Sequence, residues 1–188
     1  MTYFVRAPGT CGEFIQGSIE GQPFFVTCSI NRYSYGMTNV AHPLTEYYCS
    51  LQPKAALARQ YTLEHMGLCQ SGCQHPIYVR SDIVQGKGMA SSSADISVAA
   101  MATALAHGRP LTMKALEDIC LSIEPTDASF YPSVVQFDYK NVWLSKPLGV
   151  CPPMKIVIFD EGGTIDTLSF NQRDDLPALI LEKEPLIA

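Results

Sequence analysis

A run of small residues directly before an apolar segment constrains this chain more than any other feature. Residues 86–95 contain two glycines and three consecutive serines, and residues 96–105 have the small, apolar composition of a buried helix. Glycine lets a backbone approach a ligand closely, and the unpaired N–H groups that open a helix bind anions. Serine hydroxyls at that point can cap the helix, contact phosphate oxygens or ligate Mg²⁺. The run indicates a triphosphate-binding loop; the alternative is a Gly/Ser loop that only caps a helix.

Length and composition limit the classes of function. The chain has 188 residues, of which 47% are hydrophobic and 16% charged, which suits one globular domain or one domain plus part of another. The formal net charge is −5 and there is no basic tract, which argues against nucleic-acid binding. No apolar run reaches the length of a membrane span, and the first residues lack the layout of a secretion signal. We therefore expect a cytoplasmic protein with neither a membrane nor a nucleic acid as partner.

The seven cysteines are scattered, and in a reducing compartment most of them should be buried free thiols. Four potential zinc ligands lie in one segment: His65, Cys69, Cys73 and His75. The gap between the two cysteines is longer than in the usual zinc knuckle, and glycine and proline residues interrupt the segment. A loop with incidental thiols is the preferred interpretation.

The hydrophobic pattern predicts a mixture of strands and helices. Strands are expected over residues 3–7 (ended by Pro8 and Gly9), 24–30, 33–40, 47–51 and 77–80. Helices are expected over 53–66, over 91–106 and from a cap at Thr112 to residue 123. Residues 134–137 and 142–144 indicate a hairpin.

Prolines and glycines gather at residues 147–153 and predict a linker, and residues 154–159 predict an apolar strand after it. We therefore divide the chain into an N-terminal domain, 1–147, and a partial C-terminal domain, 148–188. Half a sheet would leave unpaired edges, so a homodimer is one expected outcome.

Two further segments carry side chains suited to phosphoryl transfer. Glu124 and Asp127 flank a proline at the end of the third expected helix, where a carboxylate can ligate Mg²⁺ or accept a proton from an alcohol. An acidic turn exposed to solvent is the alternative. Near the N-terminus, residues 7–17 form a glycine-dense turn that can present Glu13 to a polar ligand. Cys11 has no histidine near it in sequence, so a nucleophilic role is disfavoured.

These three segments together resemble the GHMP small-molecule kinases, and within them the L-threonine kinase subgroup. The resemblance rests on residues 7–13, 86–95 and 124–127, and residues 160–167 and 170–174 also fit the subgroup. It implies an α+β fold: a GHMP-kinase N-terminal α/β domain with a ribosomal-protein-like βαβ unit, followed by the beginning of a ferredoxin-like C-terminal domain. It also implies ATP-dependent phosphorylation of the hydroxyl of L-threonine to O-phospho-L-threonine, serving cobalamin side-chain synthesis, with ATP and Mg²⁺ required.

The resemblance also assigns roles to residues. The ATP-binding residues would be Gly86, Lys87, Gly88, Met89, Ala90, Ser91, Ser92 and Ser93. Those near the phosphoacceptor would be Gly9, Cys11, Gly12 and Glu13, where charge complementarity suggests that Glu13 holds a substrate ammonium. Ser92 and Glu124 would ligate the metal, and Asp127 would be the catalytic base or orient the acceptor hydroxyl.

The sequence departs from the family pattern in two places. Its loop has Met89 and Ala90 where many relatives have Leu-Gly, and the family's third glycine-rich motif is not found in these 188 residues. The chain is thus expected to be truncated in the C-terminal domain. The alternatives are a kinase for another hydroxylated amino acid or small alcohol, and a non-catalytic nucleotide-binding module.

Overall fold

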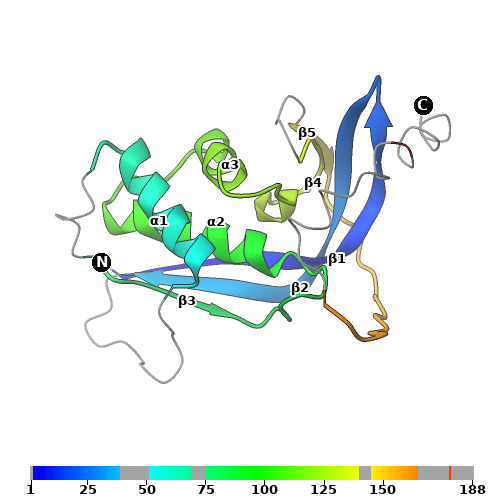
Figure 1. Ribbon diagram of the computed structural model, residues 1–188, viewed down its shortest axis with the longest axis horizontal. Helices are drawn as coiled ribbons and strands as arrows, with labels where there is room; N and C mark the ends of the chain where they lie inside the picture. Colours follow the sequence, from blue (N-terminus) through cyan, green and yellow to red (C-terminus); the bar gives the residue numbers. More distant parts are fainter. Residues whose placement is uncertain (1, 39–50, 69–74, 140–144, 165–177, 179–188) are drawn as a thin grey trace.

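A computed structural model describes residues 2–38, 51–68, 75–139, 145–164 and 178. An antiparallel sheet lies under three helices (Figure 1). The strands are β1 (Tyr3–Ile19), β2 (Gln22–Thr38), β3 (Ile77–Ser81), β4 (Val134–Phe137) and β5 (Ser145–Gly149). The helices are α1 (Pro53–His65), α2 (Ser91–Ala106) and α3 (Met113–Leu121), with a short 3₁₀ turn, η2 (Ala128–Phe130). This confirms a mixed α and β architecture.

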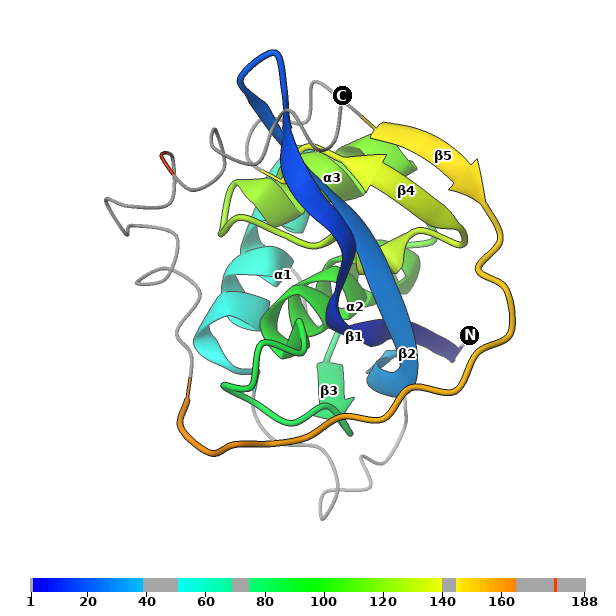
Figure 2. The ribbon, with the colours of Figure 1, turned by 90° about the vertical axis from the view of Figure 1, so that its right-hand side faces the viewer.

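Strands β1 and β2 form one long hairpin that projects from the body of the molecule (Figures 1 and 2). Its turn consists of Glu20 and Gly21, both with positive φ, the geometry of a tight two-residue hairpin loop. The sheet order is β1-β2-β4-β5, and β3 pairs with the other end of β2. Strand β2 therefore joins both parts of the sheet.

The expected break at Pro8 and Gly9 is wrong, because β1 continues through both residues. Strand β1 lies at the edge of the sheet, where a proline without an N–H group is tolerated. Register shifts between residues 8 and 15 absorb the irregularity. The two strands expected over 24–30 and 33–40 are one strand, because β2 stays paired with β1 on both sides of residues 30–32; residues 39–40 lie outside the described part of the chain.

Helix α2 lies at the centre of the core, between the sheet and the other two helices (Figure 1). Twelve of its 16 residues are buried. Its small side chains let neighbouring elements approach closely: a Cβ added to Gly36 of β2 would lie 2.9 Å from the carbonyl oxygen of Val98. Ile96 and the alanines beside it pack against α1 and α3. The composition that predicted a buried helix is thus explained by contacts on all sides.

The other helix predictions are confirmed, with small differences at the ends. Helix α1 ends at His65, and α3 ends at Leu121, two residues before the expected position. Thr112 is the N-cap of α3, as predicted, and its hydroxyl accepts a hydrogen bond from the N–H of Ala115 at 3.2 Å. Of the described helices, none is long and apolar enough to cross a membrane.

The segment after residue 145 differs from the prediction. Pro147 and Gly149, expected in a linker, belong to β5, which pairs with β4; residues 142–144 lie outside the described part. Residues 154–159, expected as an apolar strand, pair with no described strand. They run across the surface instead (Figure 2), with the side chains of Val157 and Phe159 76% and 85% exposed. The domain boundary at 147/148 and the ferredoxin-like second domain stay predictions.

Candidate active site

The glycine-serine run forms a loop whose backbone is shaped to bind an anion. Residues Gly86, Gly88 and Ala90 have φ values of 69°, 65° and 54°. The intervening residues have negative φ, and such alternation turns successive N–H groups toward one side, which makes a concave anion site. The loop leads directly into α2, whose N-terminus adds the positive end of the helix dipole.

The serines do not cap the helix. The N-cap is Ala90, which has no side chain able to accept a hydrogen bond, and Ser91, Ser92 and Ser93 form the first turn of α2. The interpretation of the run as a simple capping loop is therefore not what the structure shows. The N–H groups of this first turn have no acceptor within the helix, because the helix has no residues four positions earlier. They can therefore bind a ligand.

The N-terminal motif lies directly against this loop. The N–H of Thr10 donates to the carbonyl oxygen of Met89 at 3.0 Å. A Cβ on Gly9 would lie 2.7 Å from the same oxygen, so only glycine allows this approach. Two segments almost 80 residues apart in sequence are thus joined by one backbone hydrogen bond.

Glu124 lies just beyond the end of α3 and is 3% exposed. Its Oε2 accepts a hydrogen bond from the ammonium of Lys54, in the first turn of α1. Its Oε1 is buried and has no hydrogen-bond partner among the described residues. A buried carboxylate oxygen without a donor is costly, which indicates that this atom is completed by a ligand.

Asp127 lies in the loop after α3, where it is the N-cap residue of η2 and contacts Ser93 in the first turn of α2. Burial, together with the neighbouring negative charges of Glu13 and Glu124, raises the pKa of its carboxyl to about 7. A hydrogen bond from the hydroxyl of Ser93 opposes this shift. Asp127 also hydrogen-bonds to the Glu13 carboxyl, whose own pKa is raised by burial and lowered by this contact. A carboxyl group that titrates near neutral pH can accept a proton from an alcohol.

The structure therefore brings together residues from the three segments that sequence analysis selected. Glu13 comes from β1, Ser93 from α2, and Glu124 and Asp127 from the loop after α3. Sequence reasoning missed Lys54, because a lysine in the first turn of a helix gives no signal that it meets a buried acid 70 residues away. It also missed the contact from Ser93 to Asp127.

Some candidate residues have other surroundings. Cys11 faces Cys28 on the neighbouring strand. The proposed metal segment is only partly described: His75 packs edge-on against His107, while Cys69 and Cys73 lie outside the described residues. Asp95, in the run itself, is buried and accepts a hydrogen bond from Ser34 at 2.5 Å, which ties α2 to β2.

The residues present fit a magnesium ion. Three carboxyl groups, those of Glu13, Glu124 and Asp127, lie close together, and the ammonium of Lys54 pairs with the Glu124 carboxylate. Their oxygen atoms are the ligands that Mg²⁺ prefers. Among the residues the structure describes, no group of three or more His, Cys, Asp or Glu side chains is arranged to hold a metal by itself. A nucleotide-bound Mg²⁺ needs only one or two protein ligands, since phosphates and water supply the rest.

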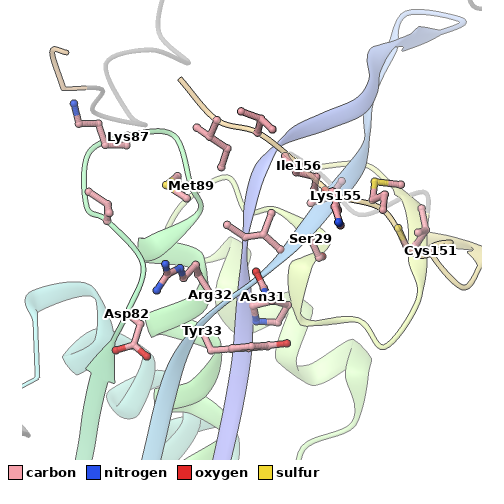
Figure 3. A pocket seen from close by; sticks show the side chains of 18 of the residues that line it. Ser29, Asn31, Arg32, Tyr33, Asp82, Lys87, Met89, Cys151, Lys155 and Ile156 are labelled. Atoms are coloured by element: carbon pink, nitrogen blue, oxygen red, sulfur yellow. The ribbon is translucent and has the colours of Figure 1, made fainter. Parts of the chain in front are cut away.

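The loop opens onto a cavity of about 1830 Å³ (Figure 3). Arg32 and Tyr33 of β2 lie on one side of it, and Lys87 and Met89 of the loop lie on another (Figure 3). Ile156 lies on a third side and belongs to residues 150–164, which we call the crossing segment. Lys87 is held over this opening by Asp160 and by the carbonyl oxygen of Gly163, both at 2.8 Å. The volume of the cavity is large enough for a nucleotide, but Glu13, Ser93, Glu124 and Asp127 are not among the residues that line it.

Comparison with known proteins finds kinases that resemble this chain in sequence. Residues 53–131 match the family model "GHMP kinases N terminal domain". The chain is 31% identical over 175 residues to an L-threonine kinase of Salmonella typhimurium, and 30% identical to an L-threonine kinase of Citrobacter freundii. Each alignment covers 89% of this chain but only 55% and 57% of the relatives, so the chain spans about half their length.

Solved structures agree on the fold. A mevalonate kinase superimposes with a TM-score of 0.55 at 12% identity, over 77% of this chain and 55% of that one. The Methanococcus jannaschii mevalonate kinase does so with a TM-score of 0.57, also at 12% identity, over 74% and 54%. Residues 53–131 of this chain therefore match the N-terminal domain of the GHMP kinases, and the described fold is the one that the mevalonate kinases share.

Proposed function

We propose that this protein transfers the γ-phosphoryl group of ATP to the hydroxyl of L-threonine. The observation that carries the proposal is the meeting of Asp127 with Ser93, because it joins the phosphate-binding loop to an acidic group of suitable pKa. The two L-threonine kinases to which the chain is similar support the choice of acceptor. The role in cobalamin synthesis, implied by the resemblance, and the cytoplasmic location, expected from the sequence, remain predictions.

The loop residues 86–90 and the first turn of α2 bind the phosphates through backbone N–H groups. Lys87 adds a positive charge at the mouth of the cavity. Ser92 and the free Oε1 of Glu124 would hold Mg²⁺, which when bound neutralises charge on the phosphates. Lys54 fixes the other oxygen of Glu124 and so orients Oε1.

Asp127 accepts the proton of the acceptor hydroxyl, or orients that hydroxyl in line with the phosphorus atom. With a pKa of about 7 it is partly ionised at neutral pH. Ser93 donates a hydrogen bond to it and holds it beside the phosphate site. The reaction is a direct displacement and needs no covalent enzyme intermediate.

Glu13 supplies the argument for an amino acid as acceptor. In L-threonine the ammonium and the hydroxyl lie on adjacent carbon atoms. Glu13 and Asp127 are in hydrogen-bond contact, so a molecule that gives its hydroxyl to Asp127 places a neighbouring ammonium beside Glu13. A simple alcohol would leave Glu13 without a cationic partner.

The test is an ADP-release assay with MgATP and L-threonine, L-serine, L-homoserine or a simple alcohol such as 2-propanol. We expect the highest kcat/KM with L-threonine. For a Glu13→Gln variant we expect a larger loss with amino acids than with 2-propanol. Equal activity toward all four acceptors would reject L-threonine as the substrate, and nucleotide binding without transfer to any of them would favour a non-catalytic module.

A further inference from the structure

Two thiols lie in contact across the β1–β2 hairpin, and no step of the proposed reaction uses them. The Sγ atoms of Cys11 and Cys28 are 3.6 Å apart. The Cys11 thiol also points toward the carbonyl oxygen of Cys28 at 3.9 Å. Both cysteines are free thiols.

The backbone at this point can bring the two sulfur atoms together. Thr10 pairs with Ser29 and Glu13 pairs with Thr27, so three steps along β1 face two steps along β2. Cys28 therefore faces a bulge that contains Cys11 and Gly12. Gly12 has a φ of 92° and no atom within 4 Å of where a Cβ would lie, so the bulge has room to move. Neighbouring strands hold facing Cα atoms at the separation that a disulfide spans.

The surroundings of the two thiols differ, and this difference determines which thiol reacts first. Cys11 is partly exposed, whereas Cys28 is 7% exposed. Burial and the neighbouring sulfur of Cys11 raise the pKa of the Cys28 thiol to about 11. A third thiol, Cys151, is close enough to contribute to that shift. These thiols do not form a metal site in the part of the chain that the structure describes.

We propose that Cys11 and Cys28 are a modification site at which a small-molecule disulfide, such as glutathione disulfide, forms an intrachain disulfide. The Cys11 thiolate attacks one sulfur of glutathione disulfide, whose S–S bond breaks and releases one glutathione thiolate. Cys28 then gives up its proton to solvent and attacks the Cys11 sulfur, which releases the second glutathione. Two protein thiols are oxidised and one glutathione disulfide is reduced to two thiols. The fixed position of Cys28 compensates for its small thiolate fraction.

Closing this bond would move the bulge toward β2. Glu13 follows Cys11 by two residues and contacts Asp127, so the movement reaches the acidic cluster. Disulfide formation itself does not depend on the proposed kinase activity, and the experiment below reads it without an activity assay.

The fully reduced chain is incubated with glutathione disulfide, its remaining thiols are blocked with N-ethylmaleimide, and it is digested with trypsin. Both cysteines lie in one tryptic peptide, residues 7–32, because no lysine or arginine lies between Arg6 and Arg32. We expect this peptide without label and lighter than its reduced form by the mass of two hydrogen atoms. A glutamate-specific protease should then cut after Glu13 and Glu20, and the outer fragments 7–13 and 21–32, each with one cysteine, should separate only after reduction.

Three variants complete the test. Cys28→Ser should retain glutathione on Cys11 as a stable mixed disulfide, and Cys11→Ser, which does not alter a buried position, should leave Cys28 unmodified. Cys151→Ser is the matched control and should close the bond as the unaltered chain does. The proposal is overturned if residues 7–32 carry two maleimide labels after incubation, if glutathione persists on Cys11 of the unaltered chain, or if either cysteine is joined to Cys151.

Discussion

The raised pKa of the Asp127 carboxyl favours catalysis but lowers the stability of the folded protein. Its pKa of about 7 is far above the ordinary value of 3.8, so the folded protein binds a proton there that the unfolded chain has already lost. The contribution to stability is fully present below pH 3.8 and is lost as the pH rises to 7. Folding is therefore penalised at the pH where the ionised base is needed.

Replacing Asp127 with Asn separates these two effects. We expect turnover to fall by roughly 10²–10⁴-fold, the range for loss of a general base, while nucleotide binding is retained. Because Asn carries no charge, the variant should also melt at a higher temperature than the unaltered protein at pH 8, and this difference should shrink at pH 5. Steady-state kinetics, nucleotide titration and thermal melts at both pH values check this. Normal turnover would remove Asp127 from the mechanism, and an equal shift in melting temperature at both pH values would contradict the raised pKa.

Ala90 has a left-handed backbone conformation, which is unusual for a residue other than glycine. Its φ of 54° is left-handed, which costs an ordinary residue about 1–2 kcal/mol, whereas glycine adopts it freely. Ala90→Gly should change the free energy of unfolding by less than about 1 kcal/mol, because relief of strain is offset by the greater freedom of glycine in the unfolded chain. Ala90→Val should lose stability, since a β-branched residue is poorly tolerated there. Urea unfolding of both variants measures this, and equal stability of the two would contradict the left-handed conformation.

At the scale of elements, the contact between β1 and the phosphate loop holds the site together. Gly9→Ala would place a Cβ 2.7 Å from the carbonyl oxygen of Met89. We expect a loss of about 1–3 kcal/mol in the free energy of unfolding, as for other overpacked positions, together with weaker nucleotide binding. Chemical denaturation and nucleotide titration measure the two effects.

Gly67→Ala is the control for this variant. Gly67 follows α1, has a φ of 70° and has no atom within 4 Å of the added Cβ. Its replacement should cost stability through backbone strain alone and leave nucleotide affinity unchanged. If both variants weakened nucleotide binding equally, the contact between Gly9 and Met89 would have no specific role in the site.

How much of this could be predicted from the sequence depended on whether a signal was local. The helix at 91–106 and the Thr112 cap were predictable because their signals lie within a few residues. The long β1–β2 hairpin was not, since Pro8 is harmless only at a sheet edge, and edge position is a property of the whole sheet. In the site, the residue types were predictable, but the pairing of Lys54 with Glu124 joins residues 70 positions apart and has no local sign.

On the scale of the whole molecule, the segment over residues 150–164 is attached by a few polar contacts rather than by a core. Its apolar side chains are largely exposed, with Val150 at 87% and Phe159 at 85%. The ammonium of Lys87 holds it through the Asp160 carboxylate and the Gly163 carbonyl oxygen. Asp160 is itself folded back onto the N–H of Gly162, and both interactions lower the pKa of its carboxyl. The phosphate loop is thus the attachment point of the crossing segment.

Removing that attachment should release the segment without unfolding the domain. In Asp160→Asn the ion pair with Lys87 is lost, and because solvent-exposed ion pairs contribute little to stability, the melting temperature should barely change. Trypsin should, however, cut faster after Lys155, which lies within the segment; Lys146 is a poor site because a proline follows it. Asp82→Asn, which breaks the exposed pair with Arg80, is the matched control and should leave cleavage at Lys155 unchanged. Mass spectrometry of a short digestion reads the rate at each site. Equal cleavage at Lys155 in both variants and in the unaltered protein would mean that the segment is held by its apolar contacts, and that Lys87 is free to turn toward a phosphate without releasing it.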